Sequence, residues 1–129
     1  MSYSSYKNIG RDLNAPPPES LTPVTKIQST EHRGEIISNN PITVIDNYTD
    51  WCGPCKQTAP QYSMLAQKYQ GRCAVVMEDV DDEIEGAREV RGVPCFHFYV
   101  RGQFMPTLTV TGGDISLVEE TLQKIMQKV

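Results

Sequence analysis

The residues with the clearest chemistry are two cysteines, Cys52 and Cys55, in residues 51–56, which read WCGPCK. A cysteine pair with this spacing can act as a redox dithiol, close a structural disulfide or supply half of a zinc site. Zinc normally takes a second close pair, whereas Cys73 and Cys95 are far apart in the sequence. We therefore expect a redox pair and no metal, with a structural disulfide as the alternative.

The pair lies where an apolar strand gives way to a helical stretch. Residues 42–48 read ITVIDNY, and apolar side chains recur at helix spacing from Trp51 to about Gln70. Unpaired backbone N–H groups and the helix dipole stabilise a thiolate at a helix amino terminus. Cys52 would be that attacking thiolate, and Cys55, one turn further in, would resolve a mixed disulfide.

The residues between the cysteines fit this placement. Pro54 suits the first turn of a helix, where its missing N–H is not needed. Gly53 allows a partner chain to approach closely. Asp46 lies in the strand before the pair, and a carboxylate amid apolar neighbours is costly to bury. We favour a functional role for Asp46 over that of a satisfied structural aspartate.

Taken together, residues 23–129 resemble the thioredoxin family. WCGPCK is that family's active-site motif without change, and Pro60 matches a proline that kinks the active-site helix. Asp46 matches a buried aspartate that assists proton transfer at the second cysteine. The resemblance implies an α/β thioredoxin fold, with a central mixed five-stranded sheet flanked by helices in the order βαβαβαββα.

The resemblance also implies a substrate groove. Val93 and Pro94 match a cis-proline segment that packs against the cysteines and hydrogen-bonds a bound peptide. Gly102 matches a hairpin glycine, and Gly112 or Gly113 a glycine of the groove. The residues implied to bind substrate are Trp51, Gly53, Pro54, Gly92, Val93, Pro94 and Gly112.

The first half of the domain supplies two elements before the cysteines. Residues 24–27 form a short strand candidate, and Ser29 or Thr30 can cap a helix that ends by residues 39–41. After the active-site helix, which Gly71 closes, residues 74–80 form another apolar strand. The acidic residues 78–85 suit the start of a short helix that ends near residues 91–92.

The second half of the domain closes with a hairpin and a helix. Residues 95–100 form a strand, and Arg101 with Gly102 turns the chain into a fifth strand over residues 104–110. Pro106 cannot donate to a sheet ladder, so this strand should lie at an edge. Gly112 and Gly113 then precede an amphipathic helix, whose apolar face contains Ile115, Val118, Leu122, Ile125, Met126 and Val129. Alternating strands and helices predict a largely parallel sheet with helices on both faces.

Length and charge narrow the class of protein. The chain has 129 residues, a length that favours one domain. Its formal net charge of -4 and its pI near 5.1 argue against nucleic acid as a partner. No apolar run is long enough for a membrane helix, and residues 1–20 lack the apolar core of a signal peptide. Residues 1–22, with three consecutive prolines, are typical of a flexible extension. We expect a cytoplasmic monomer.

Three positions depart from the family pattern. Met77 stands where the family commonly has a lysine beside the buried aspartate, so Asp46 should resist ionisation more strongly. Tyr48 replaces a frequent tryptophan, with little expected effect. Cys95 follows the presumed cis-proline and could be a regulatory site, but we favour a buried strand cysteine, as for Cys73. His32 and His97 receive no role.

The leading hypothesis is a protein-disulfide reductase that uses Cys52, Cys55 and Asp46. The resemblance implies disulfide-containing protein substrates, recycling by an external thioredoxin reductase that depends on flavin and NADPH, and no bound cofactor. The first alternative is a thioredoxin-fold binding or assembly module with little redox turnover. The second is an oxidase or isomerase, although Gly53 and Pro54 between the cysteines resemble the reducing branch of the family.

Overall fold

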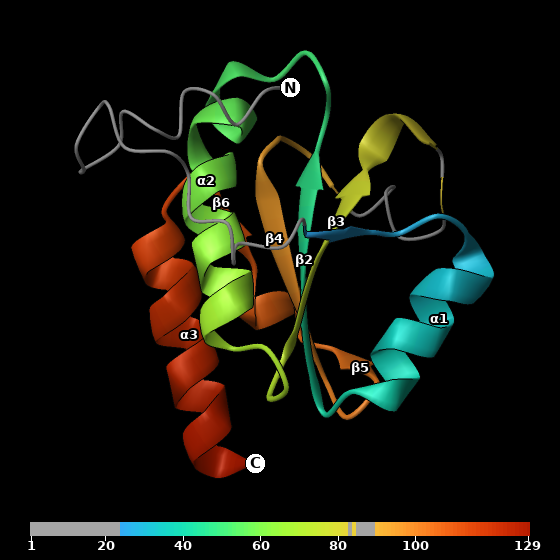
Figure 1. Cartoon of the computed structure of the whole chain (residues 1–129), viewed down its shortest axis with the longest axis vertical. Helices are drawn as coiled ribbons and strands as arrows, with labels where there is room; N and C mark the ends of the chain where they lie inside the picture. The colour runs from blue at the N-terminus through green and yellow to red at the C-terminus, as the bar shows by residue number, and fades with distance from the viewer. Residues whose placement is uncertain (1–23, 83, 85–89) are drawn as a thin grey trace.

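The chain forms one mixed sheet with helices on both faces (Figure 1). The computed structural model describes residues 24–82, 84 and 90–129. Within these residues the strands pair in the order β1-β3-β2-β4-β5, and β6 pairs with β4. They are β1 (Thr25–Lys26), β2 (Ile42–Tyr48), β3 (Ala74–Asp79), β4 (Cys95–Val100), β5 (Gln103–Phe104) and β6 (Val110–Thr111).

Strand direction divides the sheet into two parts. Strands β1, β3 and β2 run parallel, whereas β4 runs antiparallel to β2, β5 and β6. The antiparallel part therefore begins at the β2–β4 pairing and is larger than the closing hairpin that we predicted. As a result, the end of β2 and the start of β4 lie together at one edge of the sheet.

The helices cover the two faces unequally. Helix α1 (Thr30–Asn39) lies on one face, and α2 (Gly53–Lys68) and α3 (Ile115–Lys128) lie side by side on the other (Figure 1). Ser29 caps α1 by accepting a hydrogen bond from the His32 N–H, which confirms one of the two predicted caps. Asp114 caps α3 in the same way through the Leu117 N–H.

The main hydrophobic core lies between the sheet and the α2/α3 pair, and a smaller core lies under α1. The predicted apolar face of α3 buries Ile115, Val118, Leu122 and Ile125. Met126 packs only partly against this core. Val129 follows the last residue of α3 and is 44% exposed, so its assignment to the buried face was wrong.

The predicted fifth strand over residues 104–110 was also wrong. Pro106 begins a 3₁₀ helix, η4 (Pro106–Leu108), which separates β5 from β6. The reason is that proline has no N–H to donate and its ring fixes φ, so the chain leaves the ladder there. The preceding hairpin is as predicted: Val100 pairs with Gln103, and Gly102 takes a positive φ of 84°.

Two predictions fall wholly or partly outside the described residues. The acidic run over residues 78–85 begins at the end of β3 and continues into a 3₁₀ helix, η2 (Val80–Asp82), but residues 83 and 85–89 are not described. The extension over residues 1–22 is not described either. Among the described residues, no helix is long and apolar enough to cross a membrane.

Candidate active site

Helix α2 begins at the first cysteine of the pair. Cys52 is the N-cap, and its Sγ accepts a hydrogen bond from the Cys55 N–H at 3.1 Å. Pro54 occupies the first turn, where a missing N–H leaves no helical bond unmade. The two cysteines form a disulfide with Cα atoms 5.3 Å apart. The helix amino terminus is thus aimed at the Cys52 sulfur, as predicted from the sequence, and would stabilise a thiolate there once the bond is reduced.

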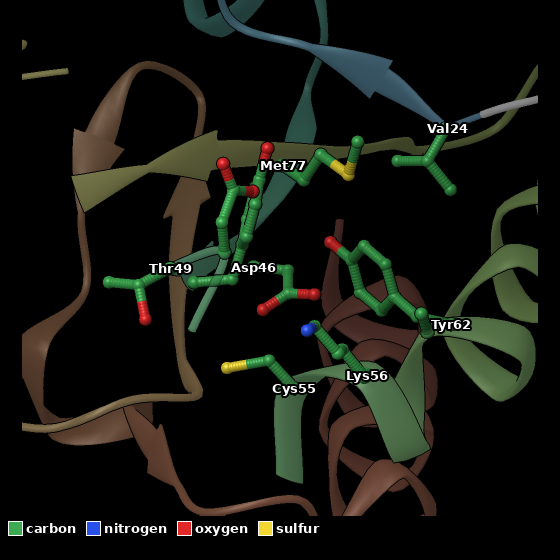
Figure 2. A pocket seen from close by; sticks show the side chains of 10 residues that line it. Val24, Asp46, Thr49, Cys55, Lys56, Tyr62 and Met77 are labelled. Carbon is green, nitrogen blue, oxygen red and sulfur yellow. The ribbon is translucent and has the colours of Figure 1, made fainter. Parts of the chain in front are cut away.

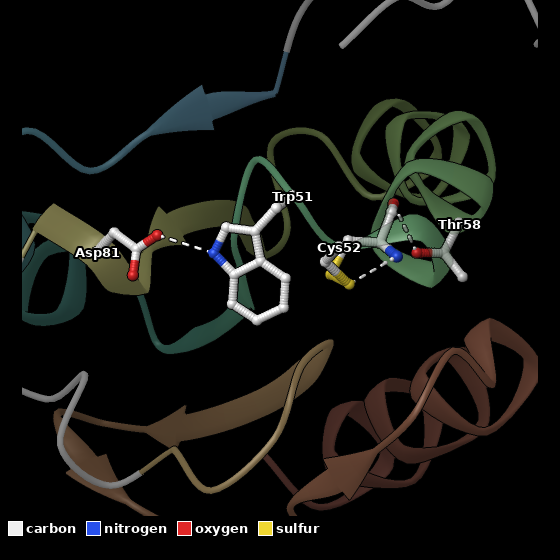
Figure 3. Close-up of a disulfide and its surroundings, with 5 residues drawn as sticks. Trp51, Cys52, Thr58 and Asp81 are labelled. Atoms are coloured by element: carbon white, nitrogen blue, oxygen red, sulfur yellow. Dashed lines mark hydrogen bonds between the residues drawn. A yellow bond between two sulfur atoms is a disulfide. The ribbon is translucent and has the colours of Figure 1, made fainter.

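The disulfide has little exposed surface, and an exposed aromatic side chain stands beside it in the sequence. Cys52 is 4% exposed and Cys55 is 5% exposed, whereas Trp51 is 72% exposed. The Trp51 indole Nε1–H donates a hydrogen bond to Asp81 Oδ2 at 3.2 Å (Figure 3). This bond connects the tryptophan to η2. Little of the cysteine pair is therefore accessible to an exchange partner, and the exposed Trp51 is its neighbour in the sequence.

Asp81 was not recognised as a site residue from the sequence. It belongs to the acidic run, but nothing in that run distinguishes it from its neighbours. The contact joins residues thirty positions apart, so only the fold brings them together.

The predicted cis-proline segment lies at the same edge of the sheet as the cysteine pair. The Val93-Pro94 peptide bond is cis, as the resemblance implied. The backbone pairing of Asn47 with Cys95 places Pro94 beside the end of β2, from which the chain continues to Cys52. Gly92 is exposed, whereas Pro94 is buried.

The two glycines after β6 have different contacts. The Gly112 N–H donates to the Pro94 carbonyl at 2.8 Å, and Gly112 takes a positive φ of 97°. A Cβ on Gly113 would lie 2.7 Å from Cγ2 of Thr58 in α2. Thr58, which the sequence analysis missed, also donates from Oγ1 to the Cys55 carbonyl at 3.1 Å (Figure 3). Gly112 therefore contacts the proline segment, and Gly113 allows close packing against the active-site helix.

Asp46 is a buried carboxylate with one oxygen that has no hydrogen-bond partner among the described residues. Its side chain is 5% exposed, and Oδ1 is buried with no hydrogen-bond partner. Burial raises the pKa of Asp46 from 3.8 to about 7. In the parallel pairing of β2 and β3, Asp46 is the register partner of Met77, so no cation opposes this effect from the neighbouring position. Asp46 can therefore bind and release a proton near neutral pH.

Asp46 and Cys55 line the same cavity. Figure 2 shows the Asp46 carboxylate amid the labelled side chains, with Cys55 and Lys56 on the α2 side and Met77 on the β3 side. The cavity has a volume of about 290 Å³. Its lining residues are Val24, Asp46, Tyr48, Thr49, Asp50, Cys55, Lys56, Ala59, Tyr62 and Met77.

None of the remaining cysteines and histidines lines this cavity, although Cys95 directly follows Pro94 and lies near enough to Asp46 for an electrostatic interaction. Cys73 and Cys95 are free and buried, and burial raises the pKa of both thiols. The ring of His97 lies edge-on to Phe104, and Nδ1 of His32 accepts a hydrogen bond from the Gln28 N–H. Within residues 24–82, 84 and 90–129, no group of three or more His, Cys, Asp or Glu side chains is arranged to hold a metal.

Comparisons with known proteins agree with this geometry. The thioredoxin family model matches residues 23–128. Thioredoxin 1 of Plasmodium falciparum is 31% identical over 69% of this chain and 85% of its own length. Thioredoxin 1 of Chlorobaculum tepidum is 43% identical over 46% of this chain, a match that spans only 60% of that relative. The oxidised structure of mitochondrial thioredoxin 3 from Saccharomyces cerevisiae superposes with a TM-score of 0.70 and 30% identity, covering 78% of this chain and 94% of that one.

Proposed function

The chain belongs to the thioredoxin family, and on that premise we propose that it is a thiol–disulfide oxidoreductase that reduces disulfides in other proteins. The observation that carries the proposal is the Cys52–Cys55 disulfide at the amino terminus of α2, with an unpaired carboxylate in the cavity beside it. A purely structural bridge would need neither the helix terminus nor a carboxylate that titrates near neutral pH.

The reaction begins with the reduced pair. The Cys52 thiolate attacks one sulfur of a substrate disulfide, so that a mixed disulfide forms and the other substrate sulfur leaves as a thiolate. Cys55 then loses its proton and attacks Sγ of Cys52, which releases the second substrate thiolate. Two electrons pass to the substrate, and the chain is left with the disulfide seen in the structure.

Asp46 is suited to accept the Cys55 proton. Both residues line one cavity, and a carboxyl with a pKa of about 7 exists in both protonation states at neutral pH. Return to the dithiol then requires an external reductant. We propose a flavin- and NADPH-dependent reductase in that role, because the chain itself supplies no electrons.

We assign substrate docking to the surface next to the disulfide. Trp51 offers exposed apolar area, Gly53 has open space around its Cα, and Gly92 is exposed near the proline segment. Substrates would be exposed disulfides of other proteins. The cytoplasmic location and the monomeric state stay predictions.

A binding module without turnover is the second candidate, and the low exposure of both cysteines favours it. Insulin reduction driven by dithiothreitol separates the two functions. We expect turnover by the full-length chain and none above the chemical background for Cys52→Ser. Wild-type turnover equal to that background would overturn the proposed activity.

The reduction potential distinguishes a reductase from an oxidase or isomerase. Equilibration of the Cys52 and Cys55 pair with glutathione measures it. We expect a value close to the thioredoxin level of about -270 mV. A value near that of protein disulfide isomerase, about -180 mV, would contradict a reductase and indicate an isomerase instead.

A further inference from the structure

The cavity next to Asp46 has the features of a ligand site. Asp46 lines this cavity, and its Oδ1 is buried with no hydrogen bond to any described group. Thr49 also lines the cavity, and its Oγ1 is buried without a hydrogen-bond partner. Buried polar atoms normally have a partner in protein or solvent, so the Asp46 carboxylate is a group of this cavity that lacks a hydrogen-bond donor.

The walls of the cavity are mainly apolar. Val24 is buried, and Met77 and Ala59 are partly buried, so they present alkyl surface. Tyr62 is buried, and the single hydrogen of its hydroxyl is already shared between the carbonyls of Val76 and Val44, at 2.6 and 3.1 Å. The aromatic ring can thus contribute a face but no free donor to the carboxylate.

Two other charged residues, Asp50 and Lys56, line the cavity. Asp50 and Lys56 are both exposed, and no ion pair joins Lys56 to Asp46 within the described part of the chain. The volume of about 290 Å³ is close to the lower end of small-molecule sites, which run from about 300 to 1,000 Å³. The cavity is therefore large enough for a small ligand and has the buried Asp46 carboxyl in its lining.

We propose that this cavity binds a small organic cation, namely a primary ammonium group carried on a short alkyl chain. The ammonium donates to Asp46, and the alkyl chain lies against Val24, Ala59 and Met77. Aromatic rings of the lining add cation–π attraction. The site needs only the carboxylate and the cavity walls, so it does not depend on thiol exchange.

The affinity for the ammonium ligand should increase as the pH rises. The ammonium binds the ionised carboxylate, and the pKa of Asp46 is about 7, so affinity should rise about tenfold from pH 6 to pH 8. The ligand ammonium stays protonated throughout this range, as a lysine with a pKa of about 10.4 does. In the oxidised chain Cys55 is part of the disulfide and does not titrate.

Other titratable groups around Asp46 do not reproduce this profile. Burial raises the pKa of Tyr48, Tyr62 and Cys95 above their ordinary values, so these groups stay neutral between pH 6 and 8. On β4 the register partner of Asp46 is Phe96, and on β3 it is Met77, and neither ionises. Asp50 and Lys56 are the other charged side chains of the lining.

The test uses the oxidised full-length chain with butylammonium chloride as the probe and butanol as the neutral match. Titration followed by amide NMR should show saturable shifts at the cavity residues with butylammonium, at least tenfold tighter than with butanol at pH 8. Saturating probe should lower the NMR titration midpoint of the Asp46 carboxyl by one pH unit or more. Equal affinity for both probes, or shifts confined to exposed residues around Asp50, would overturn the proposal.

Three variants separate the site from general surface binding. Asp46→Asn should remove the dependence on pH and weaken butylammonium binding at least tenfold. Met77→Lys should also abolish binding, because the new ammonium takes the ligand's place, whereas Met77→Leu should retain it. Because all arms are read without turnover, failed binding beside normal insulin reduction would overturn this inference and leave the proposed function intact.

Discussion

Two buried carboxylates on adjacent strands illustrate how a partner changes the role of a charge. Asp46 on β2 and Glu78 on β3 are 5% and 1% exposed. Asp46 faces the α2/α3 side of the sheet, and no ion pair or hydrogen bond to its Oδ1 is found among the described residues. Glu78 follows Met77 in β3 and so lies on the opposite face, where Arg33 Nε donates to Oε1 at 3.2 Å.

The two carboxylates differ because Glu78 has a cationic partner, Arg33. Arg33 also hydrogen-bonds the Tyr99 hydroxyl and stacks over its ring, so the partner of Glu78 is itself held in place. Burial raises the pKa of Glu78, and the Arg33 guanidinium opposes that rise. Burial acts on Asp46 unopposed. The compensated carboxylate joins α1 to the sheet, whereas the uncompensated one lies in a cavity beside the disulfide.

The largest expected effect comes from removing the uncompensated charge. The folded-state pKa of Asp46 is about 7 and the ordinary value is 3.8, so ionising Asp46 opposes folding by roughly 4 kcal/mol above pH 7. Below pH 3.8 this cost to the free energy of folding is absent, and between pH 3.8 and about 7 it grows as the pH rises. Asp46→Asn should therefore stabilise the chain at pH 8 by roughly 3 to 4 kcal/mol, and by little at pH 4. Urea unfolding at both values measures this, and a gain independent of pH would contradict it.

Breaking the compensated pair should have the opposite sign. Arg33→Met leaves Glu78 buried without its cation, and we expect a loss of about 3 kcal/mol in the free energy of unfolding. The matched control is the double variant Arg33→Met with Glu78→Met, which removes both charges and should recover most of the loss. A double variant as unstable as the single one would show that packing, and not charge, carries the effect.

Supplying a cation to Asp46 should make the two carboxylates alike. Met77→Lys places an ammonium at the register partner of Asp46. We expect the titration midpoint of Asp46 to fall by at least one pH unit, equivalent to about 1.4 kcal/mol. Carbon-13 NMR of the carboxyl follows the midpoint, and Met77→Leu is the control without charge. An unchanged midpoint would mean that the new lysine points to solvent.

The smallest effect should come from an exposed pair. Lys68 Nζ and Glu119 Oε2 are 2.5 Å apart, but their side chains are 58% and 28% exposed. Water screens such a pair, and Glu119 keeps a hydrogen bond from the Tyr69 hydroxyl. Lys68→Met should therefore leave the urea midpoint close to that of the wild type. A loss comparable to that of Arg33→Met would show that charge pairing matters here regardless of burial.

Local patterns in the sequence predicted most of the regular elements. Strands β2 and β4 have the predicted bounds, and Ser29 caps α1 as one of two candidates. These predictions were confirmed because β-branched runs, helix caps and helix breakers determine local structure over only a few residues. The failed fifth strand has a local cause as well: Pro106 was taken as the mark of an edge, but it ended the ladder.

Contacts between distant segments could not be predicted in this way. The hydrogen bond from Trp51 to Asp81, the packing of Gly113 on Thr58 and the pairing of Arg33 with Glu78 each join separate elements. No periodicity or motif encodes them, because each depends on how two elements are placed in the folded sheet.

The sequence by itself determined the chemistry available: a cysteine pair at the start of a helix, and an aspartate within an apolar strand. Only the tertiary structure decided the state of that aspartate. Its pKa depends on desolvation and on the absence of a cation, and both are set by the segments packed around it, Met77 of β3 and the side chains of α2. Electrostatic energy depends on distances in space, and those exist only once the chain has folded.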